Sequence, residues 1–513
     1  MADMRASFVI QPNRGLGWLS LGASLHAILT RLKSQPQLYP QIDLAYSSLE
    51  PIQDPIIISL PANGLRLRFD GPDQRLRLIE IIDFSKSTFT YKSIELVRRS
   101  GSTNDDSIEF VPGPSFKHLY NRLFGPSFPG EYLPPSSDDS QGTYVLSWPG
   151  LAARFELNHN SWSETADFPS LLSSPAASPA RSLAIFAGAS WPETRSTLYS
   201  KRPQLPRSLA LTNKAVDYVP DEIEEVVIHS SGSLELFRRT ALPLMIILNE
   251  TTPQDLVAEL GPPDAIFRKS VGGLSIHAGG ISSKDRRPSM SPNLDPHHNN
   301  REQPSSKSYT DDSETEVSNV VEHEEDGDMS TEAFYNYFHH GFDALVSTPQ
   351  PSRSARSEES ATPSADFVVT KVFLHGNIPG SYSFNRHRRS RWRIALDDNG
   401  QPLPLTSEMR FSEVSDILKD VWHDSYSDVE EEKRMQRGMV LNRGWGIGDS
   451  PESSIELLGG FEEGPTAKTA NPLKGMVDGM PNLNNTELFG FPGLLFEVLK
   501  NDTISCLTVY KPD

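Results

Sequence analysis

The sequence concentrates arginine in one short segment. YSFNRHRRSRWR, residues 382–393, holds five arginines with one histidine and one tryptophan. Guanidinium groups bind phosphates and carboxylates through paired hydrogen bonds, so this composition suits a lipid phosphate or an acidic partner. The candidate contact residues are Arg386, Arg388, Arg389, Arg391, Trp392 and Arg393.

The geometry expected of this segment favours a basic stripe. In an extended strand, Arg389, Arg391 and Arg393 would lie on one face and Trp392 on the other. An anionic membrane surface would attract such a stripe by about 1 kcal/mol per basic residue. The alternative is a structural role, in which the arginines neutralise acidic inserts of the same chain or keep an edge strand solvated. The pattern leaves both interpretations open.

Motifs for catalysis and metal binding are missing from the sequence. There is no G-x-S-x-G nucleophile elbow and no H-E-x-x-H zinc helix. Gly15 and Gly17 lack the preceding strand of a dinucleotide fingerprint, and the adjacent His339 and His340 would point to opposite faces of a strand. Cys506, in the apolar segment ISCLTVY, is interpreted as a core thiol. We therefore predict a protein that is not an enzyme, with no catalytic, cofactor-binding or metal residues.

Composition excludes several classes of protein. The net charge of −19 argues against general nucleic-acid binding, which depends on basic residues that neutralise phosphates. The single cysteine excludes an intramolecular disulfide and a cysteine-based zinc site. The longest dense apolar run, ALPLMIIL at 241–248, is far shorter than the ~20 residues that span a bilayer, and the N-terminus lacks a signal-peptide pattern. These features predict a cytoplasmic protein whose membrane contact is peripheral.

Segments of low hydrophobicity interrupt the chain. Three of them lie at about 272–330, 347–366 and 424–471 and are rich in Ser, Pro and acidic residues. Such segments bury too little apolar surface to offset the conformational entropy that folding would cost. A shorter Ser/Pro-rich segment lies at 174–182. Because apolar patterning resumes after each one, we interpret them as disordered inserts in a single fold.

Removing these inserts exposes a repeated pattern. Amphipathic segments at 24–33, 114–126, 251–263 and 410–420 are each followed by alternating apolar strands. Each strand region carries a turn glycine, at Gly64, Gly150, Gly341 and Gly493. In the third unit Thr252 can cap the helix, with Pro253 at its first position.

The predicted fold class is α+β. It consists of repeated two-layer units, each with one helix packed on a three-stranded antiparallel meander. Two units form a first lobe, 1–200, and two form a second lobe, 205–513, which the inserts interrupt.

Several longer motifs resemble a known family. RGLGWLSLGASLHAILTRLK, FGPSFPGEY, LVAELGPPDAIFRKS, KVFLHGNIPGSYSFNRHRR and GLLFEVLKNDTISCLTVY follow one another in the order found in the phagosome (phagophore) assembly factor family. The resemblance covers nearly the whole chain outside the inserts, which are longer here than in compact members.

The resemblance implies a non-catalytic scaffold or adaptor in autophagy. Members pair with a WD-repeat β-propeller protein of the breast-carcinoma-amplified-sequence type and are recruited to the phagophore assembly site, with phosphoinositide-dependent membrane association. A Golgi-linked vesicle trafficking factor and a lipid-binding module are the alternatives, and an enzyme with an unrecognised site is a third. No cofactor and no catalytic residue is implied.

Overall fold

The computed structural model describes residues 6–97, 113–135, 140–200, 221–268, 332–348, 367–398, 401–403, 405–423, 426, 428–442 and 485–511. Apart from the segment Lys269–Ser330, the chain clusters as one compact unit. The predicted insert at 272–330 lies outside the described residues, as does the one at 347–366 beyond residue 348.

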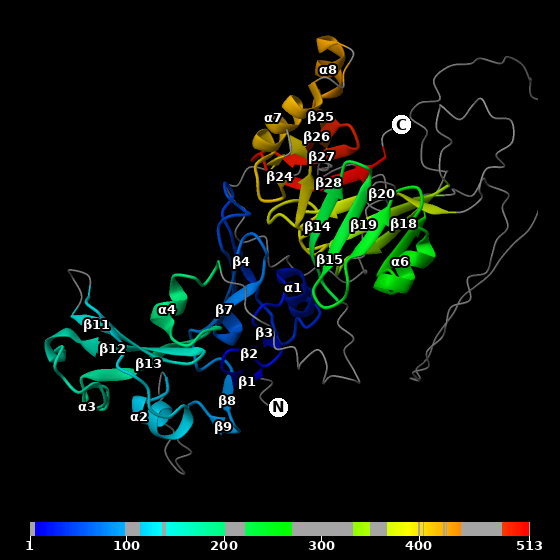
Figure 1. Cartoon of the computed structure of the whole chain (residues 1–513). Helices are drawn as coiled ribbons and strands as arrows, with labels where there is room; N and C mark the ends of the chain where they lie inside the picture. The colour runs from blue at the N-terminus through cyan, green and yellow to red at the C-terminus, as the bar shows by residue number, and fades with distance from the viewer. Residues whose placement is uncertain are drawn as a thin grey trace, which may run out of the picture. The chain divides into compact units, whose positions relative to one another are not determined.

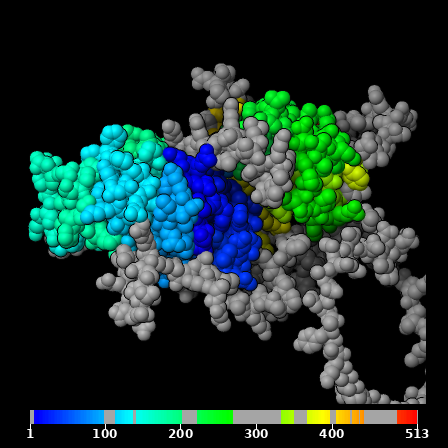
Figure 2. Space-filling view, turned by 90° about the horizontal axis from the view of Figure 1, so that it is seen from below, coloured from blue at the N-terminus to red at the C-terminus, as the bar shows by residue number. Residues whose placement is uncertain are grey.

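The first half of this unit, residues 6–200, contains two sheets. The small sheet has the order β3-β2-β1-β8-β9, and the large sheet has the order β10-β11-β12-β13-β7-β6-β5-β4. The strands are β1 (Ser7–Gln11), β2 (Gly15–Leu16), β3 (Leu19–Ser20), β4 (Asp43–Ala45), β5 (Ile56–Leu60), β6 (Leu65–Phe69), β7 (Leu76–Ile81), β8 (Thr88–Tyr91), β9 (Ile94–Glu95), β10 (Glu131–Leu133), β11 (Gln141–Trp148), β12 (Leu151–Asn158) and β13 (Ala177–Ile185). The helices are α1 (Leu25–Lys33), α2 (Phe116–His118) continued by a π-helical turn (Leu119–Leu123), α3 (Phe168–Leu172) and α4 (Trp191–Arg195). Figure 2 shows this half, coloured from blue to green-cyan, as one continuous surface.

The second half begins at residue 221 and repeats the two-sheet plan. Its small sheet has the order β16-β15-β14-β21-β24, and its large sheet the order β17-β18-β19-β20-β28-β27-β26-β25. The strands are β14 (Ile223–His229), β15 (Ser233–Arg238), β16 (Leu244–Ile247), β17 (Ala265–Arg268), β18 (Ala333–Tyr337), β19 (Phe342–Ser347), β20 (Val368–His375), β21 (Trp392–Ala395), β24 (Leu405–Thr406), β25 (Met439–Asn442), β26 (Asn485–Phe491), β27 (Leu494–Leu499) and β28 (Ile504–Tyr510), with a separate hairpin of β22 (Asp397–Asp398) and β23 (Gln401–Pro402). The helices are α6 (Pro253–Leu260), α7 (Phe411–Trp422) and α8 (Val429–Met435).

The two halves share one topology. Figure 1 draws the described parts of the first half in blue to green-cyan and those of the second half in green to red. Each starts with a three-stranded meander, then a helix and a four-stranded meander, and then a strand that returns parallel to the first one, as β8 does beside β1 and β21 beside β14. A second helix and a second four-stranded meander follow. The last strands of the two meanders pair antiparallel, β7 with β13 and β20 with β28, and so join them into one eight-stranded sheet.

The observed elements modify the predicted repeat. A helix precedes a meander at each of the four predicted places, but each meander has four strands instead of three. The small sheets were not predicted, because their pairing joins segments far apart in the chain. The lobe boundaries at 1–200 and 205–513 stay predictions.

Three local interpretations were wrong. The segment 174–182 is largely strand β13, where Ala180 is buried and pairs with Phe155. The insert predicted at 424–471 contains helix α8, capped by Asp428, and strand β25, while residues 443–471 lie outside the described residues. Strand β1 does precede Gly15, but a hairpin to β2 follows it where a dinucleotide site needs a helix.

The core follows the sequence pattern. Leu65, Leu67 and Phe69 of β6 alternate inward and are fully buried. Leu25 and Ile28 of α1 belong to the same core cluster. The third helix has the expected start, since Thr252 and Asp255 form a capping box and Pro253 is the first helical residue.

No helix in the described part of the chain is long and apolar enough to cross a membrane.

Four equivalent turns depend on glycine. Gly64, Gly150, Gly341 and Gly493 each begin the third strand of a meander or directly precede it, at φ values of 69°, 79°, 86° and 78°. Residues with a side chain rarely adopt this left-handed conformation. At Gly341 a Cβ atom would also lie 2.5 Å from the carbonyl oxygen of Arg388.

Replacing Gly341 with alanine is therefore expected to cost more than replacing Gly232, which has a φ of 78° but whose added Cβ atom would meet no atom closer than 3.7 Å. Gly232→Ala should lower the free energy of unfolding by about 1–2 kcal/mol through backbone strain alone. Gly341→Ala should lose about 1–3 kcal/mol more, because the new methyl group overlaps backbone. Urea unfolding of both variants measures the difference, and equal losses would show that the close approach to Arg388 is unimportant.

Candidate functional site

The arginine-rich segment lies in the loop between β20 and β21. This loop, residues 376–391, is named the junction loop because it contacts the first half of the chain. The side chains of Asn377 and Gln74 are both buried, and each donates to an oxygen of the other residue at 2.8 Å. Gln74 lies in the polar turn between β6 and β7. That turn therefore docks on a loop about 300 residues away in sequence.

Arg389 is the central contact of the junction loop. It is 4% exposed, and its guanidinium donates to the carbonyl oxygens of Pro72, Gly376 and Ser407 at 2.8, 2.8 and 3.1 Å. Burial lowers its pKa to about 10, so it remains charged at neutral pH. Arg389 thus connects the first half, the junction loop and the segment before α7.

Arg388 is buried in a second charged group. It lies 3.6 Å from the carboxylate of Glu222 and donates to the carbonyl of Ile223. Arg75 from the first half binds the same carboxylate at 2.6 Å. Burial alone would raise the pKa of Glu222, but the surrounding guanidinium groups hold it below its usual value.

The remaining members of the predicted site differ in exposure. Arg391 binds Asp73 and Glu408, each at 2.7 Å. Trp392 is 3% exposed and belongs to the core of the second half. Arg393 is 46% exposed and pairs with Glu225 at 3.3 Å. The carbonyl oxygen of Arg386 lies 3.2 Å from Nε2 of His26.

The prediction that these arginines form a stripe on one exposed face of a strand is therefore wrong. Arg389 and Arg391 precede the strand, and Arg388, Arg389 and Trp392 are buried. Strand β21 lies between β14 and β24, so it is not an edge strand either. The arginines do neutralise carboxylates of their own chain, but those carboxylates lie in described turns, loops and strands outside the predicted inserts.

A small cavity adjoins these groups. It has a volume of about 20 Å³, room for one water molecule, and its charged lining includes Asp73, Arg75, Glu224, Arg239 and Arg391. The volume is too small for a lipid chain or an inositol headgroup, and the polar lining does not suit a lipid chain.

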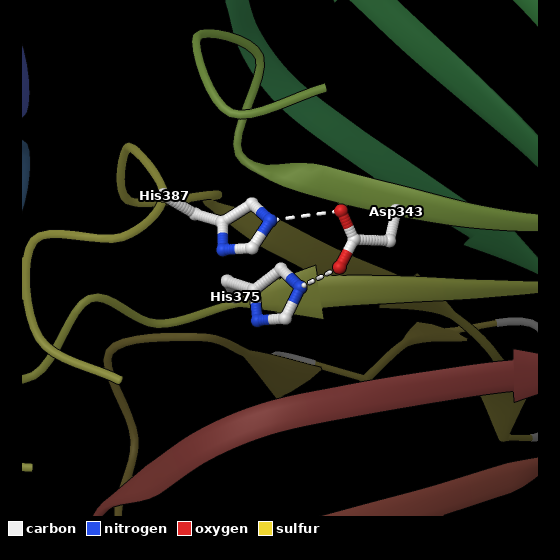
Figure 3. A group of neighbouring side chains, drawn as sticks. All are labelled: Asp343, His375 and His387. Atoms are coloured by element: carbon white, nitrogen blue, oxygen red, sulfur yellow. Dashed lines mark hydrogen bonds and ion pairs between the residues drawn. The ribbon is translucent and has the colours of Figure 1, made fainter. Parts of the chain in front are cut away.

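The junction loop is anchored at its other side by the Asp343 cluster, defined as Asp343, His375 and His387 (Figure 3). The two imidazoles lie one above the other, with ring centroids 3.7 Å apart, and both reach the same carboxylate. Nε2 of His375 lies 2.9 Å from Oδ2 of Asp343, and Nε2 of His387 lies 2.8 Å from Oδ1. Asn336 donates to Oδ1 at 3.0 Å.

The two histidines of the cluster have different charge states. Burial would raise the pKa of Asp343, but the two imidazoles hold it far below its usual value. Burial would lower the pKa of His375, yet Cys506 and Asp343 raise it to about 10. Burial and the adjacent His375 lower the pKa of His387 to about 4. At neutral pH the cluster therefore holds a carboxylate, one imidazolium and one neutral imidazole.

Cys506 extends the polar row that runs through this cluster. It is the cross-strand partner of His375 on one side and of Glu497 on the other. The thiol is half-buried, so the prediction of a core thiol was incomplete. The other histidines singled out from the sequence lie apart: His339 bonds Asp264 at 2.9 Å, and His340 is buried.

Sequence reasoning missed the Asp343 cluster because its members are far apart in the chain. The one available signal was Asp343 itself, an acidic residue within the apolar strand FDALVS. Lys, Glu, Arg and Asp are almost never buried without a partner.

Comparison with known proteins then decides the family. The family described as Phagosome assembly factor 1 matches residues 15–295 and 303–510. The chain belongs to the phagosome assembly factor 1 family. An Arabidopsis thaliana relative named as a PHAF1 protein is 24% identical over 98% of this chain and 93% of its own length. A Drosophila melanogaster PHAF1 protein is 22% identical over 96% of this chain and 90% of its own length.

A Caenorhabditis elegans PHAF1 protein is 32% identical over 26% of this chain and 28% of its own length. No solved structure matches the chain significantly. Membership of the phagosome assembly factor 1 family indicates an autophagy-related role, and the family is named for assembly and not for catalysis.

Proposed function

We propose that this protein is a non-catalytic scaffold of autophagy that binds a WD-repeat β-propeller partner of the breast-carcinoma-amplified-sequence type. In this proposal the complex is recruited to the phagophore assembly site and associates peripherally with phosphoinositide-bearing membrane. Family membership supports the autophagy-related role. The observation that supports a protein partner is an apolar sheet edge in the second half.

That edge is strand β16, the terminal strand of the second small sheet. Its Leu244 and Ile246 point into the core, while Met245 and Ile247 are 45% and 38% exposed. Just before the strand, Leu242 is 81% exposed. Residues 221–268, which include this strand, form the green surface in Figure 2.

The equivalent edge of the first half is built differently. Strand β3 has two residues, whereas β16 has four. Short edge strands are one way in which proteins prevent strand addition, and exposed apolar side chains on a longer edge favour it. A partner that covers this edge would satisfy its unpaired main-chain groups and bury the exposed aliphatic side chains.

The test is co-precipitation of the propeller partner with the full chain carrying Met245→Lys and Ile247→Lys. Lysine at 245 faces Glu235 across the strands, so the fold should tolerate it. Recovery of the partner should fall by about tenfold or more, as expected when central apolar contacts worth 1–2 kcal/mol are lost.

The matched control is Val9→Lys with Ile94→Lys, which adds the same charge to the first small sheet at 47% and 43% exposure. Partner recovery should stay at the wild-type level in this control. Sedimentation with phosphatidylcholine vesicles, with and without phosphoinositide, tests the membrane part separately. Equal recovery of the partner by both double variants would rule out the β16 edge as the surface that binds the partner.

A further inference from the structure

We propose that Asp343, His375 and His387 form a binding site for one divalent transition-metal ion of the zinc class. This site is independent of the partner surface on β16. It joins two strands of the large sheet, β19 and β20, to the junction loop.

The donor atoms indicate the class of ion. Two imidazole nitrogens and a carboxylate supply ligand atoms that all lie within 4.8 Å of one another. Nitrogen donors combined with one carboxylate suit Zn²⁺ and Co²⁺, whereas Ca²⁺ and Mg²⁺ prefer oxygen donors throughout.

The required rearrangement is a short displacement together with a turn of one ring. The two imidazole planes are now nearly parallel, at 12°, so one ring must turn before both Nε2 lone pairs can point at one ion. Bonds of about 2.0–2.2 Å at a tetrahedral angle separate two ligand atoms by about 3.4 Å. The present Nε2 to Oδ distances are 2.9 and 2.8 Å, so each pair would open by about half an ångström. The ion would then take the place of the protons that now lie between Asp343 and the two rings.

Neighbouring groups hold the carboxylate and adjoin one of the two rings. Asn336 holds the carboxylate of Asp343, and Cys506 adjoins His375 on the neighbouring strand. Nδ1 of His387 is buried and has no hydrogen-bond partner among the described residues, so no hydrogen bond at that atom opposes the turn of this ring. The side chains of His375 and Asp343 are 17% and 12% exposed, so the cluster is not fully enclosed.

A bound ion would fasten the junction loop to the sheet. His387 belongs to the loop, where Arg388 bonds Ile223 of the second half and Arg389 bonds Pro72 of the first half. Metal binding that requires the folded arrangement adds its binding free energy to stability. The ion is therefore expected to raise the thermal midpoint of the whole chain.

Cobalt titration of the untagged full chain tests this site. We expect one Co²⁺ per chain, a visible absorption band typical of tetrahedral nitrogen and oxygen ligands, displacement by Zn²⁺ and a thermal midpoint that rises with Zn²⁺ and falls with chelator. Asp343→Asn and His387→Gln should each weaken binding more than about 100-fold, since changes to outer partners alone cost about 10–100-fold. Near-ultraviolet circular dichroism in chelator verifies that each variant is folded.

The control is His339→Gln, which removes another His–Asp pair with the same 2.9 Å separation but an exposed histidine. It should bind Co²⁺ as the wild type does. If the wild type fails to bind stoichiometrically, the cluster is a hydrogen-bonded ion pair only and the metal site is refuted. Unchanged binding in a folded His387→Gln or Asp343→Asn chain would refute it equally.

Discussion

Arg389→Met is expected to lower the free energy of unfolding by about 3–5 kcal/mol. The substitution keeps much of the side-chain volume but leaves the buried carbonyls of Pro72, Gly376 and Ser407 without their donor. Each unsatisfied buried acceptor costs about 1–3 kcal/mol. Urea unfolding followed by tryptophan fluorescence measures the loss.

Two further variants separate the hydrogen bonds from the charge. Arg393→Met removes an exposed ion pair and should change the free energy of unfolding by less than about 1 kcal/mol. Arg389→Lys keeps the charge, but one ammonium cannot reproduce the fork that reaches three carbonyls, so it should recover only part of the loss. If Arg389→Met and Arg393→Met behaved alike, the junction would not depend on Arg389.

Acidification from pH 6.5 to pH 4 is expected to destabilise the fold steeply. Burial, as the main cause, lowers the pKa of His26, His340 and His387 to about 4 each, against about 6.5 when unfolded. Between these values the unfolded chain binds up to three more protons than the folded chain. Stability therefore rises with pH across this window and is lost as the pH falls, at up to about 4 kcal/mol per pH unit.

The other perturbed histidines act outside that window. The pKa of His339 is raised by its hydrogen bond to Asp264, and the pKa of His375 is about 10. Both are protonated in the folded and unfolded chains below pH 6.5, so their stabilisation is lost only as the pH rises above that value. The lowered pKa values of Asp343 and Glu222 add to the loss of stability at low pH, where these carboxylates become protonated.

Urea unfolding at several pH values tests the histidine assignment. His340→Gln should reduce the slope between pH 4 and 6.5 by about 1.4 kcal/mol per pH unit, the value of one proton. His339→Gln is the comparison and should reduce the slope less, because His339 titrates above this window and acts within it only through its charge on His26 and His340. A slope that responds equally to the two substitutions would contradict the assignment.

Local patterns were sufficient to predict most of the large sheets. Alternation at Leu65, Leu67 and Phe69 indicates a half-buried strand whatever its partners are, and Gly64 and Gly341 mark turns that need a positive φ. Thr252 and Pro253 specify a helix start through contacts within four residues. Such features depend on neighbours in the sequence, so they can be read without the fold.

The candidate sites depended on distant residues and could not be predicted. Nothing near Arg389 in sequence shows that three carbonyls surround it, because one of them lies 317 residues away. The arginine pattern is equally compatible with an exposed stripe and with a buried junction. Asp343, His375 and His387 likewise come together only when β19, β20 and the junction loop are in place.

The joined meanders have a consequence for folding during synthesis. Strand β28 pairs with both β20 and β27 at the middle of the second large sheet, yet the ribosome makes it after the other seven strands. Until then β20 presents an unpaired edge rich in valine, which is a site for pairing with other chains. A nascent chain that stalls between β27 and β28 should therefore aggregate or recruit a chaperone, while one that stalls after β13 has already paired the whole first sheet.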